Sequence, residues 1–311
     1  MREANISDLH YNIRNYQPID FDNYVGLVAQ AEELEPKGRC LIPEVIIEHL
    51  YYPEQNLFIV EIDVGLVGYM NVWPELTIAR IILDCWIHPD YRRKGIAKKL
   101  TDYAVSHGKK LGVKYAHVNV PESDVDAQYI LSKLGFSNVR RYIEMSIETD
   151  KINWECTGND GFECRCMKEG EESKLVEIQN RAFTGTWGYN PNTVEEISYR
   201  ANMLYHSPED VILICKGDTI AGYCWTRKNI TGKVGASETK GQIFMLGVDE
   251  NYRGGNIGRR VLLAGISKLV NEGLLIIELI VDSQNETAYK LYQSVGFEVK
   301  ASSLWYEKTI S

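Results

Sequence analysis

The sequence predicts a mixed α/β protein of the α+β type, built as two similar halves that each contain one central mixed sheet flanked by helices. Three observations lead to this prediction. The chain has 311 residues, which is long for a single hydrophobic core and favours about two domains. Segments rich in β-forming residues alternate with segments of helical periodicity, in the same order in each half. A short loop rich in Arg and Gly also occurs twice, in matching contexts.

The repeat consists of matching residues separated by a constant offset of 161 positions. Tyr91 and Arg92 of the first half correspond to Tyr252 and Arg253 of the second. A period of this length indicates a duplicated domain rather than a solenoid. We therefore expect an N-terminal domain at 1–149 and a C-terminal domain at 150–311. Later pairs keep the offset without a gap, and they are Gly112 with Gly273, Val120 with Val281, Ala127 with Ala288, Gly135 with Gly296 and Phe136 with Phe297.

In the first half, apolar residues at helical spacing predict a helix at 20–35, which Pro36 and Gly38 end. A turn at 63–65 joins two β-rich runs into a hairpin. Gly112 ends the helix that follows the first Arg/Gly loop. The expected elements are strands at 13–14, 57–62, 66–73, 78–87 and 115–120, helices at 20–35, 96–111 and 125–134, and final strands through about residue 148.

The polar stretch Asp150–Gly161 is the best candidate for a linker, and the second half then repeats the order. The stretch 183–206 is expected to be irregular or helical, and 229–241 reads as a polar loop. The expected elements are strands at 162–167, 211–216, 219–227, 242–248 and 275–281, helices at 171–182, 257–272 and 286–295, and final strands to the end of the chain.

Each Arg/Gly loop leads from a predicted strand to the start of a predicted helix, in the stretches Ile87–Ala97 and Val248–Gly258. The first N–H groups of a helix have no backbone partner, and the helix dipole favours an anion there. Small residues allow a pyrophosphate to approach the main chain. A tight turn explains one such loop equally well, but two copies in matching contexts favour sites for a phosphate-bearing ligand.

A second motif follows the loop of the second half, on the helix predicted at 286–295. Asn285 stands at the start of this helix, where its amide can cap the helix or bond an amide of a ligand. Tyr292 shares one helical face with Ala288 and Leu291. It is either a core aromatic, which is the commoner case at such a position, or a phenol that donates a proton into the site.

Together these motifs read Val-x-x-x-Tyr-Arg-x-x-Asn-Ile-Gly, followed by Asn-x-x-Ala-x-x-Leu-Tyr-x-x-x-Gly-Phe. The pattern resembles the GNAT superfamily of acetyl-CoA-dependent N-acetyltransferases, and in particular its tandem members. The resemblance covers nearly the whole chain twice and is strongest at 242–297. The segments 222–226 and 247–249 are also similar to the mycothiol synthase type of tandem enzyme.

The resemblance implies two GNAT-like acyl-CoA N-acyltransferase domains with acetyl-CoA as co-substrate. It implies that Asn285 contacts the pantetheine arm and that Tyr292 protonates the departing thiolate. The residues implied to offer backbone groups to the pantetheine are Leu246, Gly247 and Val248. The residues implied to hold the pyrophosphate are Arg253, Gly254, Gly255, Asn256, Ile257 and Gly258, with Ile87, Arg92, Arg93, Lys94, Gly95, Ile96 and Ala97 as the first-half set.

The two halves differ at the positions that the chemistry needs. At the constant offset Asn285 corresponds to Asp124, and Tyr292 corresponds to Leu131, which cannot donate a proton. Tyr129 is close in sequence but lies about 160° round the helix from that position. We therefore expect the C-terminal half to be the catalyst and the N-terminal half to be catalytically weak or inactive, although it can still bind acetyl-CoA or brace its partner.

The sequence departs from the family pattern at the position of the general base. Many relatives carry Glu six residues before the Val of the loop strand, where this chain has Gln242, and Gln cannot accept a proton. Glu238 and Glu278 are the candidates in the second half, either of which can also be a solvated surface carboxylate. Asp84 is the corresponding candidate in the first half. The missing Glu also argues against a strict mycothiol synthase assignment.

Composition limits the location and the partners. The net charge of −9 is shared by both halves, so neither is a basic nucleic-acid binder. The first residues lack the apolar core of a signal peptide, and no apolar run approaches the length of a membrane span, so we expect a cytoplasmic protein without a membrane partner. The seven cysteines form no regular disulfide framework. Cys156, Cys164 and Cys166 lie close together in sequence, but no matching Cys/His pair follows at zinc-site spacing, which favours reduced thiols over a metal site.

The sequence therefore predicts an N-acetyltransferase that moves an acetyl group from acetyl-CoA to a primary amine by direct attack in the C-terminal half. Trp187 and Tyr189, in the stretch 183–206, could floor a small pocket, which favours a small-molecule acceptor. Two alternatives stay open. One is a protein N-acetyltransferase, and the other is a non-catalytic acyl-CoA-binding or interaction module.

Overall fold

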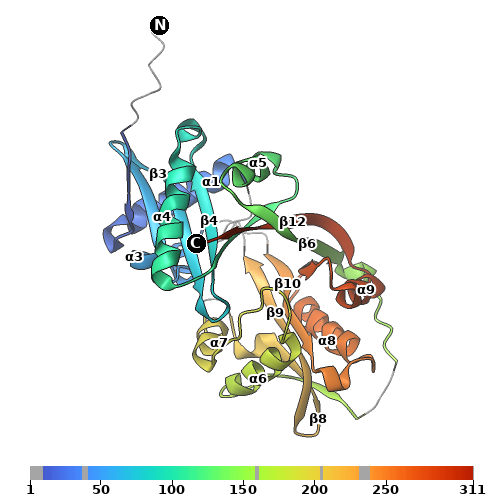
Figure 1. Cartoon of the computed structure of the whole chain (residues 1–311). Helices are drawn as coiled ribbons and strands as arrows, with labels where there is room; N and C mark the ends of the chain where they lie inside the picture. Colours follow the sequence, from blue (N-terminus) through green and yellow to red (C-terminus); the bar gives the residue numbers. More distant parts are fainter. Residues whose placement is uncertain (1–9, 37–40, 158–160, 204–205, 231–238, 311) are drawn as a thin grey trace.

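The computed structural model describes residues 10–36, 41–157, 161–203, 206–230 and 239–310. In these residues helices lie on both faces of a single sheet of 12 strands (Figure 1). The strands are β1 (Asn12–Asn15), β2 (Leu57–Ile62), β3 (Gly65–Glu75), β4 (Arg80–Ile87), β5 (Tyr115–Pro121), β6 (Ser137–Glu148), β7 (Glu163–Cys166), β8 (Val211–Lys216), β9 (Thr219–Ile230), β10 (Thr239–Val248), β11 (Ile276–Asp282) and β12 (Glu298–Thr309).

The helices confirm the predicted order and add three short ones that sequence periodicity did not reveal. The added helices are α2, α3 and α7, which span four to eight residues and are too short for a clear periodic pattern. The helices are α1 (Phe21–Leu34), α2 (Pro43–Glu48), α3 (Pro53–Asn56), α4 (Ile96–Leu111), α5 (Val125–Lys133), α6 (Glu172–Phe183), α7 (Val194–Ala201), α8 (Ile257–Asn271) and α9 (Glu286–Val295). Among the described residues, none of the helices is long and apolar enough to cross a membrane.

The strand order is β1-β2-β3-β4-β5-β12-β6-β11-β10-β9-β8-β7, so the last strand of each half has been exchanged. β12, from the end of the chain, pairs with β5 of the first half, for example at Leu304 and Val120. β6, from the first half, pairs with β11 of the second, for example at Met145 and Leu279. β6 and β12 pair with each other and join the two halves (Figure 1).

This exchange corrects two expectations from the sequence. Each half was expected to have its own sheet and several final strands, whereas each contributes one long final strand to a shared sheet. The reason is that side-chain alternation determines which face of a strand is buried but not which neighbour it pairs with. The linker prediction falls partly on residues 158–160, and the polar loop at 229–241 falls mostly on 231–238; these residues lie outside the described ranges.

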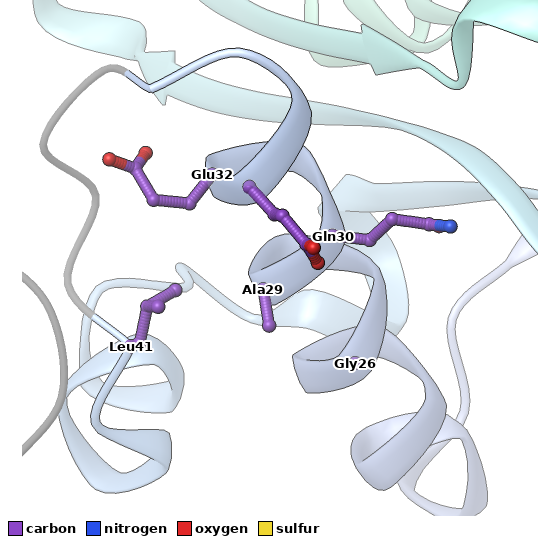
Figure 2. Close-up of a pocket in the computed structure, with 6 residues that line it drawn as sticks. Gly26, Ala29, Gln30, Glu32 and Leu41 are labelled. Carbon is purple, nitrogen blue, oxygen red and sulfur yellow. The ribbon is translucent and has the colours of Figure 1, made fainter.

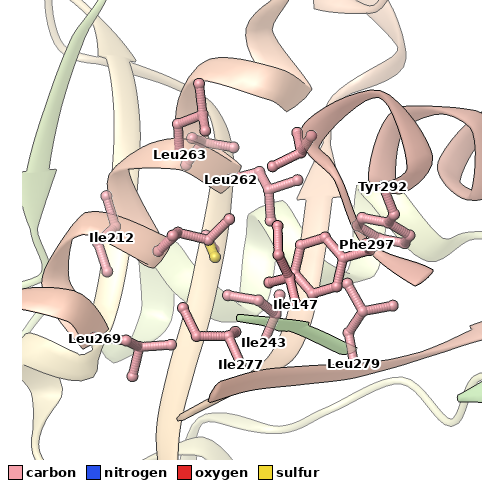
Figure 3. Packing of buried hydrophobic residues seen from close by; sticks show 14 of the residues in the cluster. Ile147, Ile212, Ile243, Leu262, Leu263, Leu269, Ile277, Leu279, Tyr292 and Phe297 are labelled. Carbon is pink, nitrogen blue, oxygen red and sulfur yellow. The ribbon is translucent and has the colours of Figure 1, made fainter. Parts of the chain in front are cut away.

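The hydrophobic cores follow the exchanged strands. Met145 and Ile147 of β6 belong to the core beneath α8, where Ile147 lies close to Ile277 and Phe297 (Figure 3). Tyr306 of β12 belongs in turn to the core beneath α4. Each core is therefore completed by a strand from the other half. The boundary between residues 149 and 150 therefore divides the two sequence repeats, but it does not separate the two hydrophobic cores.

The second half shows how one strand serves two cores. Successive residues of a strand point to opposite faces of its sheet. Tyr223 and Trp225 of β9 pack with α6 and α7, whereas Cys224 between them packs with α8. We call the two faces the α6/α7 face and the α8 face.

Candidate active site

The strands that lead into the two loops separate from their neighbours at equivalent places. β10 pairs with β11 only over residues 241–243, and a bulge at Phe244 follows directly. β4 likewise pairs with β5 only over residues 80–82. We call these separations the C-terminal fork and the N-terminal fork. Beyond the C-terminal fork, Leu246, Gly247 and Val248 pair with β9 on one side. On the other side, no strand among the described residues pairs with their backbone groups.

The two Arg/Gly loops follow the same backbone path. Each begins with a short 3-10 turn, at Pro89–Tyr91 and Glu250–Tyr252. In the second loop Gly254 (φ 89°) and Asn256 (φ 58°) both adopt the left-handed conformation. Arg93 (φ 60°) and Gly95 (φ 78°) do so at the same offsets in the first. Asn tolerates this conformation better than other side chains do, so Asn256 keeps the loop geometry that Gly95 provides.

Each loop ends at a helix N-terminus that no side chain caps. Asn256 precedes α8 and Gly95 precedes α4, and neither caps its helix with a side-chain hydrogen bond. Arg260 N donates to Asn256 O at 2.9 Å, so the three N–H groups before it have no partner within the helix. These groups and the helix dipole suit an anion such as a pyrophosphate.

The arginine of each loop holds the loop in place. Arg253 donates from Nε to Val248 O at 3.1 Å and from Nη2 to Ala182 O at 3.0 Å. Arg92 donates from Nε to Ile87 O at 2.8 Å. The side chain therefore ties the loop to the end of its own strand.

Tyr292 lies at the edge of the core beneath α8 and is 7% exposed, with its ring edge-on to Phe297 at 6.0 Å (Figure 3). Burial is the main cause that raises its pKa well above the usual range, and the nearby Cys224 thiol adds to it. The phenol is therefore neutral near pH 7, which is the form that can donate a proton. The interpretation of Tyr292 as a core aromatic is confirmed, and its role as a proton donor stays a prediction.

Asn285 caps α9, since its Oδ1 accepts a hydrogen bond from Ala288 N at 3.1 Å. The Nδ2 group then remains for any ligand. Asp124 caps α5 in the same way, accepting from Ala127 N at 2.9 Å. Leu131 is buried like Tyr292, whereas Tyr129 is 64% exposed. The first half therefore has the cap but no inward hydroxyl at this position.

Among the described residues, the candidate bases offer no free carboxylate beside the C-terminal fork. Glu278 accepts hydrogen bonds from Lys240 at 2.9 Å and from Lys300 at 3.2 Å. These ammonium groups outweigh the effect of burial and hold the pKa of Glu278 below its usual range, which disfavours it as a base. Glu238 lies outside the described residues. In the first half, Asp84 accepts a hydrogen bond from Tyr69 at 3.2 Å.

Sequence reasoning did not identify Arg227, which occupies the place next to Gln242. Its Nε donates to Gln242 Oε1 at 2.6 Å, so an Arg–Gln pair stands where many relatives carry Glu. The signal was present in the alternation of β9, because Arg227 shares a face with the buried Tyr223 and Trp225. A charged residue on the inner face of a strand marks a functional candidate.

An aromatic group, the junction cluster, lies where the halves meet. Trp187, from the segment between α6 and α7, has ring-centre distances of 5.6 Å to His117, 6.2 Å to Tyr142 and 6.0 Å to Trp305. Arg80, at the N-terminal fork, lies 5.8 Å from the Trp187 ring centre. Trp187 therefore packs between the halves, and the expectation that it floors a small pocket stays a prediction.

The chain next to Trp187 approaches Arg80 closely. Arg80 Nη2 donates to Gly188 O at 2.8 Å, and a Cβ at Gly188 would lie 2.8 Å from Arg80 Nη1. Gly188 also has φ 71°, so glycine is needed there for two independent reasons. A segment of the second half thus covers the base of the N-terminal fork.

His117 makes the junction cluster sensitive to acid. It is 3% exposed, and its Nε2 lies 3.1 Å from Glu307 Oε2 without hydrogen-bond geometry. Burial first, and Arg80 second, lower its pKa from 6.5 to about 4. His117 is therefore protonated below about pH 6.5 in the unfolded chain, but only below about pH 4 in the folded protein.

We therefore expect stability to fall as the pH drops from about 6.5 towards 4, by roughly 2–3 kcal/mol from this residue. Urea unfolding at pH 7 and pH 4.5 measures this loss. His117→Gln removes the titrating group, so its stability should depend less on pH over this window. Equal pH dependence in the two proteins would contradict the assignment.

A surface pocket elsewhere does not belong to this site. It lies beside α1, and Figure 2 shows Gly26, Ala29, Gln30, Glu32 and Leu41 around it. None of its lining residues belongs to either loop or fork. Among the described residues, no group of three or more His, Cys, Asp or Glu side chains could hold a metal ion.

Comparison with known proteins agrees with this geometry. The chain matches the Acetyltransferase (GNAT) family over residues 26–136 and again over 173–297. Mycothiol acetyltransferase of Corynebacterium efficiens is 26% identical over 235 residues, which cover 71% of this chain and 72% of that protein. Mycothiol acetyltransferase of Acidothermus cellulolyticus is 24% identical over 288 residues, covering 86% and 85%.

Two solved structures share the fold. A GCN5-related N-acetyltransferase from Sphaerobacter thermophilus has a TM-score of 0.74 at 21% identity and covers 96% of each chain. A tandem GNAT protein from the clavulanic acid biosynthesis pathway has a TM-score of 0.74 at 15% identity, covering 97% of this chain and 99% of that one. These two proteins therefore share the overall fold of this chain.

Proposed function

The chain belongs to the GNAT family of acetyltransferases as a tandem member, and from that premise we propose that it transfers acetyl from acetyl-CoA to a primary amine of a small molecule in its C-terminal half. One observation carries the proposal. The C-terminal half combines an open strand fork, an uncapped helix N-terminus and a buried neutral tyrosine, and the N-terminal half lacks the tyrosine.

These residues suit the parts of acetyl-CoA. The N–H groups at the start of α8 suit the pyrophosphate. The backbone of Leu246 to Val248, which no described strand pairs on the side away from β9, suits the pantetheine amides. Asn285 Nδ2 is a further donor for the pantetheine. The thioester is already reactive, so the enzyme mainly has to place the amine beside it.

In the reaction the amine nitrogen attacks the thioester carbonyl, the C–N bond forms and the C–S bond breaks. We propose that Tyr292 donates its proton towards the sulfur as negative charge develops there. The ammonium loses a proton as the amide forms. Because Lys240 and Lys300 engage Glu278, we assign this proton to water rather than to Glu278.

We propose that the N-terminal half does not catalyse acetyl transfer. Leu131 stands where an acid is needed, and the junction cluster covers the base of its fork. Its loop still has the geometry to bind acetyl-CoA, and its strand β6 completes the core of the catalytic half. We retain residues 1–149 and 150–311 as the two sequence domains, with their final strands exchanged.

A small acceptor is supported by the relatives, which are designated mycothiol acetyltransferases. The test is a free-thiol release assay with acetyl-CoA over a panel of small amines and lysine-containing peptides. We expect release with at least one small amine and none above background with the peptides. Binding of acetyl-CoA without transfer to any amine would instead support a non-catalytic acyl-CoA-binding module.

A further inference from the structure

Arg227 on β9 is a charged side chain in an apolar setting on the α6/α7 face. Its guanidinium carbon lies 4.1 Å from the centre of the Phe244 ring, which places the group over the aromatic face. Its Nε donates to the Gln242 amide, and no carboxylate among the described residues pairs with it. A buried arginine normally pairs with an acid, so this arrangement requires an explanation.

The two contacts leave the outer edge of the guanidinium open. The guanidinium plane lies over the Phe244 ring, and Nε donates to Gln242. Within the described chain, the Nη groups make no hydrogen bond. Arg227 is only partly buried, so part of its side chain remains open to a ligand. A planar guanidinium that is held rigidly with free Nη groups matches the two oxygens of a carboxylate or a phosphate.

A second arginine belongs to the helix that packs on the same face. Arg200 lies on α7, whose Ile197 and Ala201 share a core cluster with Trp225, two residues before Arg227 on β9. The one hydrogen bond of Arg200 in the described chain goes from Nη1 to Asn192 Oδ1 at 3.2 Å. Burial first, and Arg200 second, lower the pKa of Arg227 to about 10. Two cations brought together without an acid repel each other, and an anion between them would relieve that repulsion.

The pair lies beside the reaction site. Gln242, which bonds Arg227, is paired with Glu278 one step before the C-terminal fork opens. Arg227 and Phe244 line the same face of β9 and β10 as the α6 and α7 helices. A molecule that enters the fork from this face would pass the two arginines.

We propose that Arg227 and Arg200 bind an anionic group of the acceptor, so that the substrate class is an amine that also carries a carboxylate or a phosphate. This inference rests on the proposed function for the identity of the bound molecule. It also explains why Gln rather than Glu stands at position 242, because a second anion there would compete with the substrate for Arg227.

The experiment compares paired probes, one of which carries an anionic group that the other lacks. β-Alanine is paired with β-alaninamide, and phosphoethanolamine is paired with ethanolamine, so the two pairs separate a carboxylate from a phosphate. Each probe is measured by thiol release and by calorimetric titration of the CoA-bound full-length protein. We expect the charged member of at least one pair to have a kcat/KM about 10- to 100-fold higher, the range that charge-assisted hydrogen bonds support.

The variants test the assignment to these residues. Arg227→Met keeps an aliphatic stem and should remove the preference for the charged probe, mostly through KM, and Arg227→Lys should restore part of it. Arg200→Met, on the helix rather than the sheet, should reduce the preference even if Arg227→Met does not fold. Lys228→Met is the matched control, because Lys228 is the next residue of β9 and its side chain points to the other face, 3.6 Å from Glu272.

The outcomes separate this inference from the proposed function. Equal kcat/KM and equal binding for charged and neutral probes would overturn the anion site, even if neutral amines are acetylated. An unchanged preference in both Arg227→Met and Arg200→Met would overturn it as well. If no amine is acetylated, but the charged probes bind and Arg227→Met abolishes that binding, the anion site stands and the proposed transfer fails.

Discussion

Tyr292→Phe is expected to lower kcat by about 10²–10⁴-fold, the range that a positioned acid contributes. The substitution removes only the hydroxyl, and the ring remains packed against Phe297 beneath α8. The affinity for acetyl-CoA should therefore change little. Thiol release at saturating substrate gives kcat, and calorimetric titration gives the dissociation constant for acetyl-CoA.

Tyr289→Phe is the matched control for this experiment. Tyr289 lies on the same helix, and its hydroxyl accepts a hydrogen bond from Gln293 Nε2 at 3.2 Å. Removing that hydroxyl should leave kcat within about twofold of the unmodified enzyme, because a surface change is usually small. If Tyr292→Phe also retained full turnover, Tyr292 would have no part in the mechanism.

Gly255→Glu is expected to raise KM for acetyl-CoA by at least about 100-fold, because a like charge facing the pyrophosphate costs several kcal/mol. Space around Gly255 is open, and the nearest atom to an added Cβ is Ile257 Cγ1 at 3.9 Å. The backbone there also lies outside the left-handed region. The variant should therefore fold normally, which thermal unfolding checks.

The equivalent substitution in the first half is Lys94→Glu, at the constant offset of 161. Catalysis in the C-terminal half predicts that Gly255→Glu reduces turnover far more than Lys94→Glu does. Calorimetric titration of both variants also counts the acetyl-CoA sites, since Lys94→Glu should remove a site only if the N-terminal loop binds acetyl-CoA. Greater loss of turnover in Lys94→Glu would reverse the assignment of the halves.

The local features of the site were predictable because short-range rules determine them. Gly95 and Asn256 precede uncapped helices in the left-handed conformation, and the residue types alone favour that backbone. Tyr292 and Leu131 both point inward, as the helical periodicity of α9 and α5 indicated. The difference in chemistry between the two halves was predicted by comparing positions 161 residues apart, where Tyr292 corresponds to Leu131.

Features that join distant segments were not predictable. The sequence did not indicate that Trp187 lies against His117 and Trp305 at the junction. Arg227 was not identified as a candidate, because its importance depends on Gln242, Phe244 and Arg200 lying near it. The role of Glu278 as a base became less favourable once Lys240 and Lys300 were found beside it.

The sequence by itself determined the duplicated α/β fold, the two phosphate-type loops and the half that carries the tyrosine. Repeat spacing, side-chain alternation and helix-start chemistry act over a few residues and can be read in order. Only the tertiary structure decided that β6 and β12 change places and that Arg227 contacts Phe244 and Gln242 beside the C-terminal fork. Strand pairing and side-chain charge interactions depend on which surfaces meet in space, and no local pattern in the chain specifies that choice.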